Sequence, residues 1–263
     1  MWRKELEICK KAAVKAGLAI LDVYENADDF MVEYKSDNSP LTIADKKANQ
    51  IIVDILSKEF PNYAILSEEG KDDLKRLESD YCFIVDPLDG TKEFIKRNGQ
   101  FTVNIALAHK HKSVLGVIYV PVTGELYFAC EGYGAYRKLS GEELQRIHVS
   151  DNMGTDNLRV VASSSHGCEQ MDALVEKYKL KNLVNKGSSL KGCMIAAGEA
   201  DVYFRFNPTM EWDTAAMQCI VEEAGGIFSQ MDHSRMLYNR ENSLNDRGFY
   251  IVNRKENILV KEQ

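Results

Sequence analysis

The chain has 263 residues, of which 44% are hydrophobic and 28% are charged, and its formal net charge is −7. This length supports one large domain or two ordinary ones, and the composition is typical of a globular protein. The negative charge argues against a nucleic-acid polymer or an anionic membrane as the main partner. The sequence makes no prediction of an oligomeric state.

Six cysteines are scattered along the chain, with no Cys-x-x-Cys pair and no histidines at zinc spacing. Free thiols in a reducing cytosol are the simplest interpretation. The first residues lead into a charged amphipathic segment without an apolar signal core, and no apolar run has the length of a membrane span. We therefore expect a cytoplasmic protein without a stable membrane anchor, and leave open a peripheral position at the inner membrane.

Two amphipathic helices are expected near the N-terminus. Apolar residues recur at steps of three and four from residue 6 to residue 23, which predicts the first helix. Residues 30–35 predict a short strand, and the turn formers at 36–40 predict a turn. The second helix begins after Thr42, a good N-cap, and ends before residue 61. Asp45 is its third residue, where a capping box is one interpretation.

Two predicted strands each end in a carboxylate. Residues 63–67 predict a strand followed by Glu68, and residues 81–85 predict a buried strand with Asp86 at its carboxyl end. In open α/β sheets, functional sites gather at the carboxyl ends of strands. We therefore expect Glu68 and Asp86 to lie in one site.

The segment at 86–91 is Asp-Pro-Leu-Asp-Gly-Thr. Its proline fixes φ and its glycine permits a turn, so that Asp86, the Leu88 carbonyl and Asp89 can converge on one point. Oxygen ligands at this density suit Mg²⁺. A Pro-x-Asp-Gly turn without a ligand is one alternative. The Asp-x-Asp-Gly-Thr motif of aspartyl-phosphate phosphatases is another, but there the two aspartates are one residue closer.

The chain then becomes rich in predicted strands, as in an antiparallel sheet. These strands cover residues 101–108, 114–120 and 125–130. Residues 140–157 carry turn formers and few large apolar side chains. This change predicts a boundary near residue 150, with an N-terminal α+β domain at 1–150 and a C-terminal α/β domain at 151–263.

A second pattern of alternating strands and helices follows the predicted boundary. Its strands are expected at 158–162, 183–184, 202–206 and 248–252, and its helices at 169–179, 187–198 and 211–224. The last of these helices ends at a pair of glycines, a C-terminal stop signal.

Four motifs occur in the order and rough spacing of the inositol-monophosphatase-like phosphatases, which are Mg²⁺-dependent and lithium-sensitive, and this resemblance covers the whole chain. The motifs are residues 42–45 (Thr-Ile-Ala-Asp), 68–70 (Glu-Glu-Gly), 86–91 (Asp-Pro-Leu-Asp-Gly-Thr) and 212–216 (Trp-Asp-Thr-Ala-Ala). Segments 92–99 and 101–104 closely resemble the bacterial branch that hydrolyses 3'(2'),5'-bisphosphate nucleotides, the CysQ type. Inositol monophosphatases usually have asparagine where this chain has Glu93.

The resemblance implies an α+β fold of the sugar-phosphatase type, layered α-β-α-β-α. Its N-terminal sheet would be antiparallel and its C-terminal sheet mixed α/β. The N-terminal domain would carry most metal ligands, and the C-terminal domain would carry the nucleotide contacts and Asp213.

The resemblance also implies two or three Mg²⁺ ions. Their ligands would be Glu68, Asp86, Asp89, Asp213 and the carbonyl of Leu88. In such a site one metal lowers the pKa of an attacking water and another stabilises the leaving oxygen. Thr91 and Asp45 would orient and deprotonate that water, so no covalent phospho-aspartate is needed. The backbone N–H groups of Gly90 and Thr91 would bind the phosphate.

The implied substrate-binding set combines the metal site with four nucleotide contacts. It comprises Glu68, Asp89, Gly90, Thr91, His166, Ser188, Lys191, Arg205 and Asp213. Plainer interpretations exist: Ser188 and Asp213 suit helix caps, Lys191 a solvated cation and His166 a loop residue. Arg205 in an apolar strand is harder to explain, because an unpaired buried guanidinium is costly.

The predicted reaction is hydrolysis of adenosine 3',5'-bisphosphate to AMP and phosphate, which would clear a by-product of sulfate assimilation. An inositol monophosphatase or another sugar phosphatase on the same scaffold is the alternative. A catalytically silent nucleotide-binding regulator should have lost part of the reactive set. That set, Asp45, Glu68, Asp86, Asp89, Thr91 and Asp213, is complete.

Overall fold

The computed structural model describes residues 1–27, 31–35, 40–163 and 168–260. The elements up to residue 150 are α1 (Arg3–Asn26), β1 (Glu33–Tyr34), β2 (Pro40–Leu41), α2 (Ile43–Glu59), β3 (Ala64–Ser67), β4 (Tyr81–Asp89), α3 (Thr91–Ile95), β5 (Thr102–His109), β6 (Lys112–Val120), β7 (Glu125–Cys130), β8 (Gly134–Lys138) and β9 (Leu144–Ile147). The later elements are β10 (Arg159–Ser163), α4 (Glu169–Tyr178), β11 (Asn182–Lys186), α5 (Leu190–Ala196), β12 (Val202–Arg205), β13 (Thr209–Met210), α6 (Glu211–Glu223), β14 (Ile227–Gln230), β15 (Leu244–Asn245) and β16 (Phe249–Val252).

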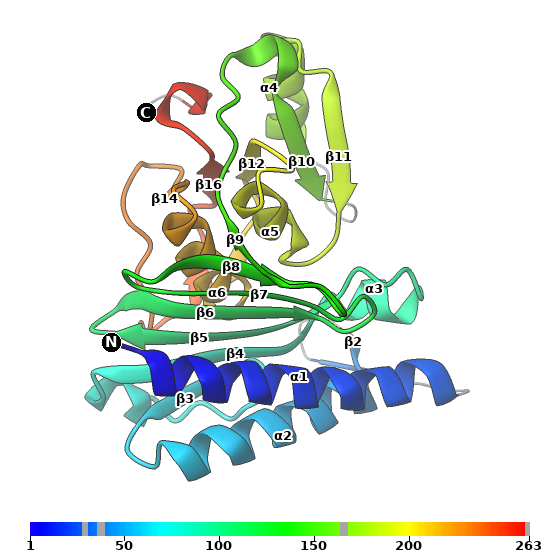
Figure 1. Ribbon diagram of the computed structural model, residues 1–263, viewed down its shortest axis with the longest axis vertical. Coiled ribbons are helices and arrows are strands. Elements are labelled where there is room, and N and C mark those ends of the chain that lie inside the picture. Colours follow the sequence, from blue (N-terminus) through cyan, green and yellow to red (C-terminus); the bar gives the residue numbers. More distant parts are fainter. Residues whose placement is uncertain (28–30, 36–39, 164–167, 261–263) are drawn as a thin grey trace.

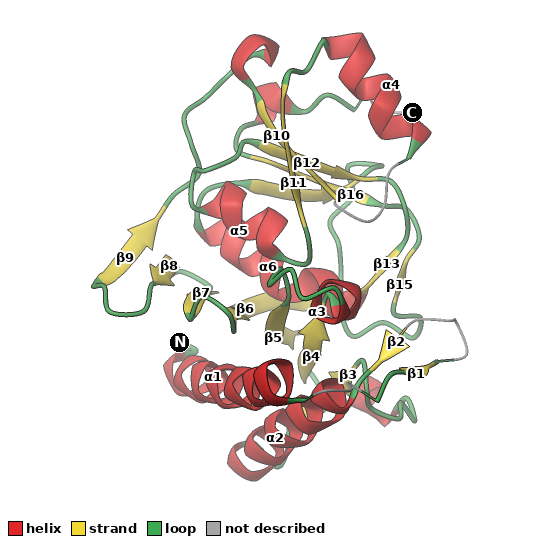
Figure 2. Ribbon diagram, turned by 90° about the vertical axis from the view of Figure 1, so that its right-hand side faces the viewer, coloured by secondary structure: helices red, strands yellow, loops and turns green. Residues whose placement is uncertain are grey.

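Helices and sheets alternate in layers (Figure 1). Helices α1 and α2 cover one face of a seven-stranded sheet of order β3-β4-β5-β6-β7-β8-β9. Figure 2 shows α5 and α6 between this sheet and a five-stranded sheet of order β11-β10-β12-β16-β14. Helix α4 packs on the outer face of the second sheet. The α-β-α-β-α order and the α+β class expected from the resemblance are confirmed.

The pairing within each sheet determines which strand ends meet. The seven-stranded sheet departs from the expected antiparallel arrangement at one pair: β3 and β4 are parallel, and the other neighbours are antiparallel. The parallel pair brings the carboxyl ends of β3 and β4 to the same edge, where the Glu68 N–H donates to the Val85 carbonyl over 3.1 Å. In the second sheet β10 is parallel to β11 and β12, whereas β16 is antiparallel to β12 and β14, so it is mixed as expected.

Several short strands were not predicted from the sequence. They are β2, β8, β9, β13, β14 and β15. β9 lies inside residues 140–157, where turn formers predicted a domain boundary, and it was missed because its residues are mostly exposed and give no apolar pattern. The strand expected at 30–35 is confined to β1, and residues 28–30 and 36–39 lie outside the described part of the chain. The chain leaves the first sheet at Ile147 and enters the second at Arg159, and the division into two domains near residue 150 stays a prediction.

Helix α6 lies against the face of β5 and β6 that points away from α1. Its approach to β6 depends on Gly116, since a Cβ there would lie 2.2 Å from the Ala216 carbonyl oxygen. Nearby, the Ser113 hydroxyl donates to the Ala215 carbonyl over 2.7 Å. These contacts fix the first turn of α6, and Asp213 with it, above the sheet.

All six cysteines are free, as predicted. Among the described residues, no helix is both long enough and apolar enough to cross a bilayer.

Candidate active site

Three aspartates from two elements form an acidic cluster. Asp86 and Asp89 come from β4 and Asp213 from α6, and one carboxylate oxygen of each lies within 4.8 Å of the others. Asp86 is 1% exposed. Closely spaced carboxylates of this kind are typical ligands of a hard divalent cation. The three side chains can therefore hold a metal ion.

Strand β4 delivers two of these aspartates through an irregularity. The strand was expected to end at Asp86. Instead it continues to Asp89, with a shift in its pairing with β5 between these two residues. Pro87 lies within the shift, beyond the end of β3, where its missing N–H breaks no ladder. The turn follows at Gly90, whose φ of 95° favours glycine, as predicted.

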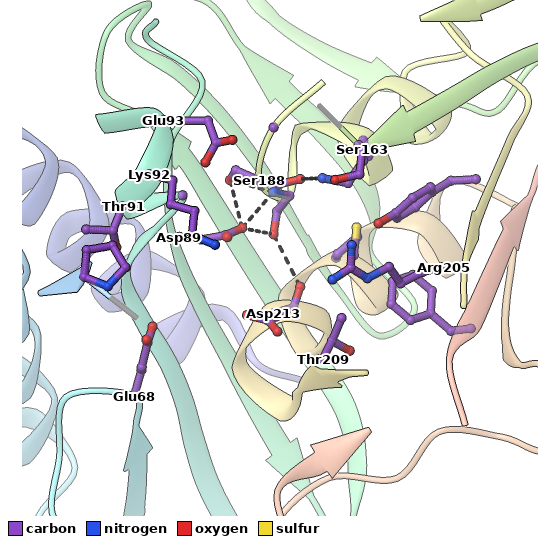
Figure 3. A pocket seen from close by; sticks show the side chains of 18 residues that line it. Glu68, Asp89, Thr91, Lys92, Glu93, Ser163, Ser188, Arg205, Thr209 and Asp213 are labelled. Carbon is purple, nitrogen blue, oxygen red and sulfur yellow. Dashed lines mark hydrogen bonds between the residues drawn. The ribbon is translucent and has the colours of Figure 1, made fainter. Parts of the chain in front are cut away.

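The Asp89 carboxylate is held by donors from the C-terminal half. Its Oδ2 accepts hydrogen bonds from Ser188 Oγ at 2.8 Å, Ser189 N at 2.7 Å and Ser189 Oγ at 2.8 Å (Figure 3). Asn104 Nδ2 lies 3.3 Å from the same oxygen. The alternative interpretation of Ser188 as an N-cap is wrong: Ser189 occupies the cap position, and neither hydroxyl caps α5, because both bind Asp89.

Strand β5 supports the two serines. Thr102 Oγ1 lies 2.6 Å from Ser188 Oγ, and Asn104 Nδ2 donates to Ser189 Oγ over 2.9 Å. Thr102 and Asn104 are both fully buried and are joined by a 2.8 Å hydrogen bond. Ser188 itself has φ of 53°, a conformation that residues with side chains rarely adopt. The turn is therefore maintained by tertiary contacts.

Glu68 has a different environment. Lys35, from the end of β1, places its Nζ 2.7 Å from Glu68 Oε1 and 2.6 Å from Glu69 Oε1. All three side chains are largely buried, at 22%, 24% and 9% exposed respectively. Although burial lowers the pKa of Lys35, contact with Glu68 and Glu69 raises it above its usual value. A lysine thus neutralises this predicted ligand.

Asp45 performs two tasks with two oxygens. Its Oδ2 accepts from Thr42 N at 2.8 Å and Thr42 Oγ1 at 2.5 Å, which completes the predicted capping box. Its Oδ1 accepts from Thr91 Oγ1 at 3.1 Å. Burial raises the pKa of Asp45, and the hydrogen bonds from Thr42 oppose this rise. The cap and the pairing with Thr91 therefore coexist.

Asp213 also closes a helix end. Its Oδ2 accepts from the Met210 N–H over 2.7 Å at the start of α6, which is the cap role considered from sequence. Its other oxygen is left for the acidic cluster. Capping therefore fixes the orientation in which Asp213 meets Asp86 and Asp89.

Burial and mutual repulsion disfavour the fully ionised form of the acidic cluster. Burial raises the pKa of Asp86 well above its usual range, and the charges of Glu68 and Asp89 add to the rise. Burial followed by the charge of Asp89 raises the pKa of Asp213 to about 7. Burial also raises the pKa of Glu68, against the influence of Lys35. A bound cation would remove this repulsion.

A cavity of about 230 Å³ opens beside the cluster (Figure 3). Most predicted site residues line it, namely Glu68, Asp89, Gly90, Thr91, Ser188, Lys191, Arg205 and Asp213. Asp45, Asp86 and Leu88 do not line it, and they are buried. His166 lies outside the described residues, although Ser163, shortly before it, reaches the cavity.

The two predicted cations of the C-terminal half already have partners. Lys191 is 7% exposed, not solvated, and its Nζ donates to the Ser188 carbonyl over 2.6 Å. Burial lowers the pKa of Lys191 to about 8. Arg205 is partly exposed, and its Nε donates to the Asn207 carbonyl over 3.2 Å. The arginine is therefore not an unpaired buried charge.

Four residues that shape the site were not predicted from the sequence. Thr102 and Asn104 carried a usable signal, because they are polar residues at alternate positions of an otherwise apolar strand and must share one face. Ser189 and Lys35 carried none, since their partners lie far away in the sequence.

Comparison with known proteins gives consistent results. A protein-family model described as "Inositol monophosphatase family" matches residues 1–260 of the chain. The chain is 39% identical over 246 residues to the 3'(2'),5'-bisphosphate nucleotidase CysQ of Escherichia coli O157:H7, covering 93% of this chain and 98% of that one. The crystal structure of CysQ from Bacteroides thetaiotaomicron is similar, with a TM-score of 0.84, 44% identity and coverage of 97% and 99%. The IMPase of Thermotoga maritima has a TM-score of 0.78, 28% identity and coverage of 96% and 92%.

Proposed function

The chain belongs to the inositol monophosphatase family, and on this premise we propose that it is a metal-dependent phosphomonoesterase that hydrolyses adenosine 3',5'-bisphosphate to AMP and phosphate. The observation that carries the proposal is one cavity with an acidic cluster at one side and Lys191 and Arg205 at the other. The names of the CysQ relatives, which specify a 3'(2'),5'-bisphosphate nucleotidase, support this substrate.

The acidic cluster would hold Mg²⁺, as two or three ions. The proposed ligands are Glu68, Asp86, Asp89, Asp213 and the carbonyl of Leu88. When bound, Mg²⁺ would lower the pKa of a water molecule and offset the negative charge of the leaving oxygen. The chain's own contribution is to present carboxylates whose mutual repulsion a bound metal cation would relieve.

Thr91 and Asp45 would handle the proton of the attacking water. Thr91 Oγ1 already donates to Asp45 Oδ1 over 3.1 Å. Water donating to Thr91 Oγ1 would thus be connected to a buried carboxylate, whose raised pKa makes it a better proton acceptor. Because Asp45 Oδ2 is fixed by Thr42, the acceptor cannot turn away.

The substrate would lie across the cavity. Its hydrolysed phosphate would meet the metal ligands and the backbone N–H groups of Gly90 and Thr91. The nucleotide would extend toward Ser188, Lys191 and Arg205, and the same assignment includes His166. Positive side chains on this wall offset the overall negative charge of the protein near an anionic substrate.

An assay of phosphate release tests the proposal. Adenosine 3',5'-bisphosphate, inositol 1-phosphate and fructose 1,6-bisphosphate are offered separately, with Mg²⁺ and with EDTA. We expect turnover of the nucleotide to dominate and to require Mg²⁺. Preference for either sugar phosphate would favour the alternative, a sugar phosphatase, which the likeness to the Thermotoga maritima IMPase keeps in view.

Inhibition by Li⁺ is a second expectation of the family assignment. Full activity at high millimolar Li⁺ would count against metal exchange of the family type. The link to sulfate assimilation and the cytoplasmic location stay predictions.

A further inference from the structure

Three cations line the cavity, and two of them are already bound by the protein. Lys191 donates to the Ser188 carbonyl and lies 5.4 Å from the centre of the Tyr203 ring. Arg205 donates to the carbonyls of Asn207 and Pro208. Both side chains therefore have structural roles before any ligand arrives.

Lys92 is the third cation and differs from the other two. It follows Thr91 in α3, lines the cavity and is exposed. Within the described part of the chain, its ammonium makes neither a hydrogen bond nor an ion pair, whereas the Arg205 guanidinium donates to the Asn207 carbonyl. Figure 3 shows Lys92 and Arg205 on opposite sides of the cavity. No contact that stabilises the fold accounts for this lysine at the cavity wall.

A nucleoside bisphosphate needs a second anion site. One phosphate would lie at the acidic cluster, where the metal supplies the positive charge. The phosphate that is not hydrolysed lies elsewhere on the sugar and needs its own cation, which a metal site cannot provide. A charge-assisted contact to phosphate suits a flexible lysine, because its point charge does not require one fixed geometry.

We propose that Lys92 binds the phosphate that is not hydrolysed and so selects nucleoside bisphosphates over monophosphates. The inference rests on the proposed function. It adds a residue to the nucleotide contacts without replacing Lys191. Lys191 already donates one N–H to the Ser188 carbonyl over 2.6 Å, in the turn that binds Asp89, whereas the fold gives the Lys92 ammonium no such task.

The test compares two nucleotides that differ only in the second phosphate. Values of kcat/KM are measured for adenosine 3',5'-bisphosphate and adenosine 3'-monophosphate, in the wild type and in Lys92→Met. We expect the variant to lose about tenfold to 100-fold for the bisphosphate, through KM, as a lost charge-assisted hydrogen bond predicts. For the monophosphate we expect a change of less than about twofold. Lys92→Arg should retain most of the preference.

Lys96→Met is the matched control, because Lys96 is an exposed lysine that follows the last residue of the same short helix and does not line the cavity. It should behave as the wild type. Equal losses for both nucleotides in Lys92→Met would place the lysine at the hydrolysed phosphate and overturn the inference. Unchanged kinetics would also overturn it. Failure of the proposed function is distinguishable, since the wild type would then hydrolyse neither nucleotide.

Binding without turnover gives an independent measurement. Calorimetric titrations in EDTA compare AMP, which retains the second phosphate, with adenosine, which has none. Without metal the acidic cluster repels phosphate, so any affinity that AMP gains over adenosine comes from donors outside that cluster. Lys92→Met should weaken AMP about tenfold and leave adenosine unchanged. Equal affinities of wild type and variant for AMP would contradict the inference.

Discussion

Asp89 and Glu68 are both predicted metal ligands, but the protein holds them in different ways. We call Asp89 with Ser188 and Ser189 the Asp89 corner, and Glu68 with Glu69 and Lys35 the Glu68 corner. In the Asp89 corner, neutral donors from the other half of the chain bind the Oδ2 atom of the carboxylate. In the Glu68 corner, a cation binds the carboxylate directly.

This difference has a consequence for metal binding. Neutral hydrogen bonds orient Asp89 without cancelling its charge, so the ligand is ready before an ion arrives. Lys35 instead supplies the positive charge that a metal would supply, and a metal at Glu68 has to compete with it. We therefore expect a preformed metal position at Asp89 and a weaker one at Glu68.

The largest expected effect comes from Asp89→Asn. The amide oxygen would accept from Ser188 and Ser189, which directs the NH₂ group toward the metal position. Loss of a direct ligand should cost more than the about 100-fold typical of a lost supporting partner. Turnover is measured across a Mg²⁺ titration. Asp54→Asn, at an exposed aspartate of α2, is the control. A near-normal rate at saturating Mg²⁺ would show that Asp89 is not a ligand.

The double variant Ser188→Ala/Ser189→Ala should have the next largest effect. It removes two hydroxyl donors from Asp89 Oδ2 and keeps the ligand itself. We expect Mg²⁺ affinity to fall about tenfold to 100-fold, with most activity restored at high Mg²⁺. Calorimetry gives the affinity, and Ser229→Ala in β14 is the control, a buried serine remote from the cavity. Unchanged affinity would mean that the turn does not organise Asp89.

Lys35→Met tests the Glu68 corner and should act in the opposite direction. Removing the competing cation should raise Mg²⁺ affinity about threefold to tenfold, in keeping with the about 1 kcal/mol of a partly exposed ion pair. The midpoint of thermal stabilisation against Mg²⁺ concentration measures it. Lys46→Met is the control, since Lys46 pairs with the exposed Glu33 from the same part of the chain. A weaker Mg²⁺ affinity in Lys35→Met would show that the lysine supports the ligand.

The smallest expected effect is the pH dependence of metal-free stability. The folded pKa of Asp213 is about 7, above its usual 3.8, so the folded protein binds this proton more tightly than the unfolded chain. Stability therefore falls as pH rises from about 4 to about 7. In EDTA we expect Tm to be about 2–4 °C higher at pH 5.5 than at pH 8, the shift that about 1 kcal/mol produces.

Two variants assign this pH dependence to the acidic cluster or to the Glu68 corner. Asp213→Asn should remove much of it, because the raised pKa belongs to the acidic cluster. Glu68→Gln should remove less, since Lys35 opposes the rise at Glu68. Saturating Mg²⁺ should reduce the difference between pH 5.5 and pH 8, because the metal competes with protons. A Tm that increases with pH in EDTA would contradict the assignment.

Local sequence predicted two of the three aspartates of the acidic cluster, whereas Asp213 was implied only by the family resemblance. Asp86 and Asp89 are only three residues apart on one strand, and the apolar run before them identifies that strand. The cap of α2 was likewise readable, because Thr42 and Asp45 interact within one helical turn. Interactions of this range depend on few other residues, so a short window of sequence contains them.

The two corners could not be predicted in the same way. Ser188 and Asp89 are 99 residues apart in the sequence. The local sequence around Ser188 is equally compatible with a helix cap, so it does not indicate the contact with Asp89. Lys35 meets Glu68 only after β1 has been placed against the end of β3, which no periodicity encodes. The continuation of β4 past Pro87 depends on pairing with β5. Each of these outcomes is determined by tertiary contact.

Gly116 extends the definition of the active site to a residue that touches neither metal ligands nor cavity. Any side chain there would meet the Ala216 carbonyl and push the start of α6 away from β6. Asp213 would move with the helix, while Asp86 and Asp89 would stay with the sheet. For protein engineering, this position is a vulnerability of catalysis that a search among cavity-lining residues would overlook.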